Sequence, residues 1–75
     1  MRPRIVFLDR STIGPTVKLE RPHFPHEWME HGATRPDQVV ERLAGAGIAV
    51  TNKVPIREEH LSALPHLRMI AVAAT

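Results

Sequence analysis

Cysteine and tyrosine are absent from the sequence, and only one tryptophan and two phenylalanines are present. Without cysteine, neither disulfide bridges nor zinc sites built on thiolates can support a chain of 75 residues. Long apolar runs are also missing: none approaches the roughly 20 residues that cross a bilayer. Asp9 and Arg10 interrupt the first apolar run too early for a secretory signal. We therefore expect a cytoplasmic protein with no membrane partner.

Charge of one sign is scarce as well. Ten basic residues face eight acidic ones, and the basic residues are scattered along the chain. Nucleic-acid-binding domains usually concentrate basic residues on one face and add aromatic side chains that stack on bases. The sequence therefore predicts no nucleic-acid partner. A small nucleic-acid binder remains a minor alternative, which strongly salt-dependent DNA binding would support.

Apolar patterning is the strongest signal present. The 43% apolar content fits a globular chain, and 75 residues allow one small domain at most. Continuous apolar runs predict three buried strands, at Ile5–Leu8, Gly47–Thr51 and Arg68–Thr75. The alternating stretch His26–His31 predicts a short edge strand. Between the first two predicted strands, Ser11–Pro25 contains three prolines and no regular period, which predicts a loop of about fifteen residues.

Two helices are expected between the later strands. Thr34 offers an N-cap hydroxyl ahead of a proline, so the first helix should begin there and run to Ala44, with Val39, Val40, Leu43 and Ala44 on one face. Gly45 and Gly47 should end it. The second helix is expected from about Arg57 to Leu64, with acidic residues in its first turn.

The expected order is strand, loop, short strand, helix, strand, helix, strand. Alternation of this kind predicts the α/β class, with a parallel sheet that forms half of a doubly wound layer. No helix follows the last strand to cover its second face. We therefore expect a truncated domain, and an isolated chain whose apolar surface around Met69–Ala74 is exposed and tends to associate.

The residue types and their spacing do not favour a metal-binding or a nucleotide-binding site. His23, His26 and His31 are close in sequence, but they fall in and after a proline-rich loop and lack ligand spacing on a helix. His60 and His66 are expected at the surface or capping backbone carbonyls. The glycines at 45 and 47 follow a helix and precede a strand, whereas a dinucleotide fingerprint needs the reverse order. No metal, cofactor or serine nucleophile is predicted in this chain.

The carboxyl ends of the parallel strands are the remaining candidate site, because ligands of open α/β sheets bind there. These ends are Asp9–Ser11, Asn52–Pro55 and Ala73–Thr75. An amide, an ammonium group and small residues at one edge would suit a small anion such as a carboxylate. The alternative is structural: Asn52 makes a turn hydrogen bond and Lys53 is solvated.

Several segments of the sequence resemble those of one known family. The D-isomer-specific 2-hydroxyacid dehydrogenases, in particular the glycerate dehydrogenase/hydroxypyruvate reductase branch, have similar segments in the N-terminal part of their substrate-binding lobe. The strings TNKVP and LPxLRxIAVAAT are the most specific part of the resemblance. The matching segments are Asp9 after the first strand, Phe24–Trp28, Pro36–Leu43, Ile48–Ile56 and Leu64–Thr75.

The resemblance implies that residues 1–75 form the N-terminal half of a flavodoxin-like substrate-binding domain, whose partner, a Rossmann domain binding NAD or NADP, is absent from this chain. It implies a small 2-hydroxy or 2-keto acid substrate and a homodimer at full length. It places Ala73, Ala74 and Thr75 in a loop whose amides hold the substrate carboxylate, and Lys53 and Val54 in a loop beside the substrate cleft. The family's catalytic and cofactor-binding residues lie outside this chain.

A second function stays open from the residues alone. Half of a flavodoxin-like sheet could serve as a free-standing, non-enzymatic binding or dimerisation module. A reading frame that continues past Thr75 with glycine, an acidic or amide residue and a later GxGxxG would favour the dehydrogenase. A stop codon after Thr75 would favour the module.

Overall fold

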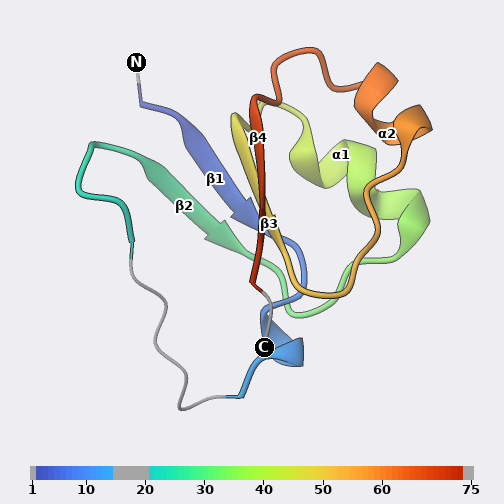
Figure 1. Ribbon diagram of the computed structural model, residues 1–75, viewed down its shortest axis with the longest axis horizontal. Coiled ribbons are helices and arrows are strands. Elements are labelled where there is room, and N and C mark those ends of the chain that lie inside the picture. The colour runs from blue at the N-terminus through green and yellow to red at the C-terminus, as the bar shows by residue number, and fades with distance from the viewer. Residues whose placement is uncertain (1, 15–20, 74–75) are drawn as a thin grey trace.

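One four-stranded parallel sheet organises the chain, for which a computed structural model describes residues 2–14 and 21–73. The strands are β1 (Arg4–Phe7), β2 (Glu27–Glu30), β3 (Ile48–Thr51) and β4 (Met69–Val72), in the order β2-β1-β3-β4. All neighbouring pairs are parallel, so the arrowheads in Figure 1 point to one end of the sheet. The predicted α/β class is confirmed, and the order is that of the first four strands of a flavodoxin-like sheet.

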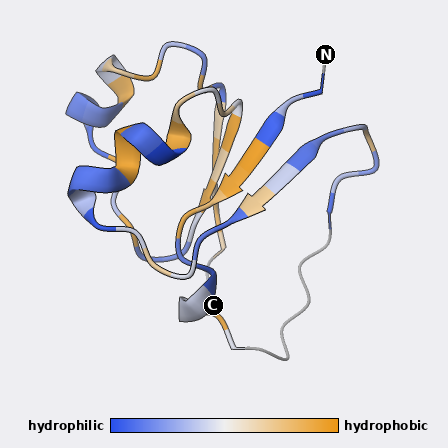
Figure 2. Cartoon of the chain, turned by 180° about the vertical axis from the view of Figure 1, so that it is seen from behind, coloured by the Kyte–Doolittle hydropathy of each residue, from blue (hydrophilic) through white to orange (hydrophobic). Residues whose placement is uncertain are grey.

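Two short α-helices, α1 (Val39–Leu43) and α2 (Glu58–Ser62), lie on the same face of this sheet (Figure 1). Two 3₁₀ turns, η1 (Arg10–Thr12) and η2 (Pro36–Gln38), follow β1 and precede α1. Figure 2 shows β1 coloured as largely apolar, and the buried residues of α1, Val39 and Leu43, pack against the sheet. None of the helices in the described part of the chain has the length and apolar character needed to cross a membrane.

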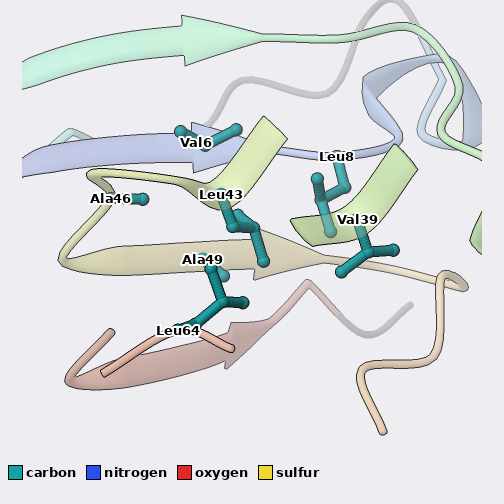
Figure 3. Packing of buried hydrophobic residues seen from close by; sticks show 7 residues of the cluster. All are labelled: Val6, Leu8, Val39, Leu43, Ala46, Ala49 and Leu64. Carbon is teal, nitrogen blue, oxygen red and sulfur yellow. The ribbon is translucent and has the colours of Figure 1, made fainter. Parts of the chain in front are cut away.

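The hydrophobic core lies between the helices and the sheet (Figure 3). Side chains alternate between the two faces of a strand, so Val6 of β1 points toward the helices while Ile5 and Phe7 point away from them. All three are nearly or fully buried, which confirms that β1 is covered on both faces. The core cluster consists of Val6, Leu8, Val39, Leu43, Ala46, Ala49 and Leu64.

The beginning of the first helix differs from the prediction. Thr34 does not cap it: the Thr34 hydroxyl donates a hydrogen bond of 2.6 Å to the carbonyl of Leu8, at the end of β1. The backbone N–H of Arg35 is instead accepted by the side-chain carbonyl of Gln38 at 2.9 Å, which closes η2 before α1 begins. A threonine hydroxyl can accept a hydrogen bond from a helix N–H or donate one to a carbonyl group. Here the Thr34 hydroxyl bonds the carbonyl of Leu8 at the sheet in place of capping the helix.

Of the two glycines predicted to end the first helix, only Gly45 does so. Gly45 has a φ of +81°, the left-handed conformation that ends a helix at little cost without a Cβ. Gly47 plays a different part: its N–H donates to Arg4 and its carbonyl accepts from Arg68, so it joins the starts of three strands. Ala44 is exposed and does not share the buried helix face, contrary to expectation.

The second helix is shorter than predicted, and His60 has an unexpected role. The predicted range Arg57–Leu64 contracts to α2 because Arg57 is the N-cap and Leu64 lies beyond the helix in the core. His60 is 7% exposed, and its Nδ1 accepts a hydrogen bond of 3.0 Å from the Arg57 N–H. The prediction of a surface or C-terminal capping role was therefore wrong for His60. His66 is exposed, as expected.

Strand β4 forms an edge of the sheet, and its side chains are largely uncovered. The described strand is shorter than the predicted Arg68–Thr75, and Met69 and Val72 are 56% and 64% exposed. The interpretation of this strand as buried is therefore wrong for the isolated chain. The expected exposure of apolar surface is confirmed as far as Val72. Ala74 and Thr75 lie outside the described residues.

Strand β2 forms the other edge of the sheet, as predicted. Arg21, in the segment that precedes β2, packs on the side chain of Trp28 in this strand. The Arg21 guanidinium carbon lies 4.6 Å from the centre of the Trp28 ring, a cation–π geometry. The indole N–H of Trp28 donates to the Glu30 carboxylate at 2.9 Å. These contacts fold residues 21–26 back against β2.

Candidate functional site

The carboxyl edge of the sheet brings together residues that are far apart in sequence. The strand order reverses between β1 and β3, and open α/β sheets bind ligands outside such a switch point. Asp9 follows β1 here, and the loop of residues 52–55 follows β3. The two segments are in direct contact, as the sequence predicts for strand ends that share one edge.

Asp9 makes that contact through its side chain. One carboxylate oxygen accepts a hydrogen bond of 2.8 Å from the Asn52 N–H, and the other accepts one of 2.6 Å from the Lys53 N–H. The Asp9 residue is only 2% exposed. Charged acceptors form stronger hydrogen bonds than neutral ones, so this pair fixes the loop firmly to the end of β1.

Two further threonines complete the loop's internal bonding. The Thr51 hydroxyl accepts from the Val54 N–H at 3.0 Å and donates to the Val54 carbonyl at 2.9 Å. The Asn52 side-chain amide donates to the Thr12 hydroxyl at 3.0 Å, and that hydroxyl donates to the Asp9 carbonyl at 2.7 Å. Asn52 therefore has the structural hydrogen bond that the alternative interpretation expects.

The candidate substrate residues can now be placed. The backbone N–H groups of Lys53 and Val54 are both used within the chain, by Asp9 and Thr51. The Lys53 side chain is exposed at the carboxyl edge, while Val54 is half-buried against the core. Ala73 follows β4 at the same edge and donates its N–H to the Thr51 carbonyl at 2.8 Å. The predicted site residues Ala74 and Thr75 lie outside the described residues.

Lys53 thus presents an exposed positive charge at this edge. Among the described residues, no carboxylate forms an ion pair with its ammonium group. A solvated lysine beside small residues can attract and hold a small carboxylate without displacing an internal partner. The role of Lys53 depends on its side chain, since its amide is already engaged.

A cavity of about 370 Å³ lies elsewhere, on the sheet face opposite the helices. Apolar residues line it, among them Ile5, Trp28 and Val50. None of the described residues that line this cavity is charged, so they favour an apolar group over a small carboxylate. The described residues also contain no cluster of three histidine, aspartate or glutamate side chains that could hold a metal ion.

His31 is a titratable group at this edge whose pKa is shifted by its environment. It follows β2, and its Nε2 is buried without a hydrogen-bond partner in the described part of the chain. Burial, and to a smaller degree the charge of Arg42, lowers the pKa of His31 below its ordinary value of 6.5. The fold therefore favours the neutral imidazole.

The lowered pKa predicts how stability depends on pH. Well above pH 6.5 His31 is neutral in both the folded and the unfolded state and contributes no pH dependence. Below that pH the unfolded chain takes up the proton first, so stability falls as the pH falls toward the folded-state pKa. Urea unfolding at about pH 7.5 and about pH 5 should show a smaller loss for His31→Gln than for the unchanged chain. Equal losses would contradict this assignment.

The sequence placed Asp9 at the carboxyl edge of the sheet, but it did not predict that the Asp9 side chain would bond the loop after β3. Its partners Asn52 and Lys53 are 43 and 44 positions away, and no local pattern reports such a contact. The available signal was an acidic residue immediately after a strand that is buried on both faces. A carboxylate at that position is taken out of water and needs hydrogen-bond donors from another strand end.

A parallel sheet with a polar loop at its carboxyl edge is typical of α/β domains that bind small ligands. No protein-family model matches the chain. It is 50% identical over 76 residues to a glycerate dehydrogenase of Methylorubrum extorquens and 42% identical over 72 residues to a putative 2-hydroxyacid dehydrogenase of Haemophilus influenzae. These matches include 100% and 96% of the chain, and 24% and 23% of the two relatives.

The chain is thus homologous to 2-hydroxyacid dehydrogenases along essentially its whole length, which confirms the resemblance stated from the sequence. It spans about a quarter of the length of the curated relatives that it matches.

Proposed function

We propose that this chain is part of the substrate-binding lobe of a longer NAD- or NADP-dependent D-2-hydroxyacid dehydrogenase. The observation that carries the proposal is the homology to two dehydrogenases along the chain. The name of the first, a glycerate dehydrogenase, favours a small 2-hydroxy acid and its 2-keto counterpart as the substrates. The full-length protein would be a homodimer.

The chain's own contribution is to form one wall of the substrate cleft. Lys53 supplies a positive charge at the carboxyl edge of the sheet, and Val54 supports the loop from the core side. Ala73, with Ala74 and Thr75 after it, supplies the small residues of the neighbouring loop. These groups bind and orient a carboxylate; we assign no proton transfer to any of them.

The residues of this chain do not fit a dinucleotide. A pyrophosphate needs a glycine-rich turn that leads from a strand into the N-terminus of a helix. Gly45 and Gly47 lie between the end of α1 and the start of β3, and the N–H of Gly47 is engaged by Arg4. The nicotinamide cofactor would therefore be held by another part of the longer protein.

The exposed β4 edge favours a second candidate, a free-standing module that dimerises through this strand. Unpaired backbone groups and uncovered side chains at Met69, Ile70 and Val72 would gain partners from a second sheet edge. In this case the chain would act through association, and it would not contribute to a substrate cleft.

A hybrid protein separates the two candidates. We define it as the M. extorquens glycerate dehydrogenase in which this chain replaces the matching segment. We expect the hybrid to oxidise NADH with hydroxypyruvate or glyoxylate, at a kcat/KM within about a hundredfold of the parent enzyme, because half of the segment's residues are identical. The 75-residue chain alone should show no turnover.

Two results would contradict the proposal. One is turnover by the isolated chain, and the other is a folded hybrid that binds NADH but has no activity. A stable dimer of the isolated chain, found together with the inactive hybrid, would favour the dimerisation module.

A further inference from the structure

The Asp9 carboxylate occupies an unusual position for an acidic side chain. It is almost completely buried, and its two oxygens accept from two consecutive backbone amides, those of Asn52 and Lys53. In the described part of the chain no lysine or arginine forms an ion pair with it. Its stability in the fold therefore depends on those two N–H groups.

This arrangement restricts the loop that follows β3. If the loop moved away from β1, a buried carboxylate would lose its donors, and such a group is costly to leave unsatisfied. Because each oxygen bonds a different amide, both the position and the orientation of the peptide between Asn52 and Lys53 are fixed. The direction in which the Lys53 side chain leaves the backbone is fixed with them.

A second contact, made by the side chain of Asn52, holds the same loop. The Asn52 amide group donates to Thr12 of η1, whose hydroxyl in turn donates to the Asp9 carbonyl. Both contacts thus join the loop to the segment immediately after β1. Because the Lys53 N–H is engaged by Asp9, Lys53 can contact an anion only through its ammonium group.

We propose that Asp9 is a positioning residue for substrate binding: it holds the loop of residues 52–55 so that the Lys53 ammonium group faces the substrate carboxylate. The inference rests on the proposed function, which assigns Lys53 to the substrate cleft. A contact that binds substrate and transition state equally changes KM and leaves kcat unaltered. A residue that only supports the fold would instead reduce the active fraction and hence the apparent kcat.

The test uses the hybrid protein and the substitution Asp9→Asn, which keeps the size of the side chain but replaces one acceptor oxygen by a donor. We expect KM for hydroxypyruvate to rise about tenfold while kcat changes less than about threefold. We also expect the amides of Asn52 and Lys53 to exchange with deuterium about tenfold faster than in the unchanged hybrid.

The matched control is Thr34→Val, which removes a hydroxyl bonded to the Leu8 carbonyl, next to Asp9 in sequence but not bonded to the loop. We expect this variant to leave KM and the exchange of the Asn52 and Lys53 amides unchanged. An unaltered KM in Asp9→Asn, with the apparent kcat reduced, would overturn the positioning role and leave a structural one.

Two further outcomes keep the inference separate from the proposed function. If the unchanged hybrid is inactive, the proposed function fails and the positioning of a substrate group fails with it. If the unchanged hybrid is active but its Asn52 and Lys53 amides exchange freely, Asp9 does not fix the loop, and only the inference is overturned. This second measurement needs no variant, so it holds even where Asp9→Asn does not fold.

Discussion

Replacing Leu43 with alanine is expected to lower the free energy of unfolding of this chain by about 2–5 kcal/mol. Leu43 is fully buried, and it extends from α1 into the core cluster that includes Val6 and Ala49 (Figure 3). The change removes buried apolar surface and leaves a cavity that a short helix cannot close completely. A chain of this length has a total stability of only about 4–11 kcal/mol. The midpoint of urea unfolding should therefore fall steeply.

The matched control for this substitution is Leu61→Ala in α2. Leu61 is 42% exposed, so the same chemical change removes little buried surface, and its effect should stay within about 0.5 kcal/mol. Far-UV circular dichroism during urea titration measures both variants. Equal losses of stability in the two variants would contradict the placement of the core on the α1 side of the sheet.

The strands could be predicted from the sequence because their signal is local. Ile5–Leu8 is a continuous apolar run bounded by charges, and such runs form parallel strands that are covered on both faces. The edge position of β2 followed from its polar alternation. The spatial order of the strands was not predicted as such, although the resemblance implied a flavodoxin-like sheet, with which the observed order agrees.

The helix ends could not be predicted in this way, and the apolar composition of β4 is no guide to its covering. Thr34 and His60 each have polar groups that fit several local motifs, and the choice among them was made by contacts with β1 and with Arg57. β4 has the composition of a buried strand, but composition does not say whether a covering element is present. The exposure of apolar side chains that was expected around Met69–Ala74 is confirmed at Met69 and Val72.

The meeting of the strand ends at one edge of the sheet was predicted from the sequence, whereas the bonds that hold the loop after β3 were not. That strand ends meet at one edge follows from parallel topology alone, so Asp9, Lys53 and Ala73 were correctly grouped. That Lys53 and Val54 would use up their own amides depends on side chains from other parts of the chain. Because of these bonds, Lys53 can contact an anion only through its ammonium group.

Reversing the charge of Lys53 should have the largest functional effect. In the hybrid protein, Lys53→Glu places a carboxylate where the substrate carboxylate is proposed to bind, and like charges in contact repel strongly. We expect KM for hydroxypyruvate to rise about ten- to a hundredfold, with kcat changed less than about threefold. Arg68→Glu is the matched control. Arg68 directly precedes β4, so it lies at the amino-terminal end of the strands, away from the carboxyl edge, and the substitution makes the same change of charge.

The KM of these two charge-reversal variants, measured side by side in the hybrid protein, tests the central claim most directly. If this chain forms the substrate wall of a 2-hydroxyacid dehydrogenase at its carboxyl edge, Lys53→Glu raises KM and Arg68→Glu leaves it unchanged. An unchanged KM in Lys53→Glu, or an equal rise in both variants, would contradict a substrate site at this edge.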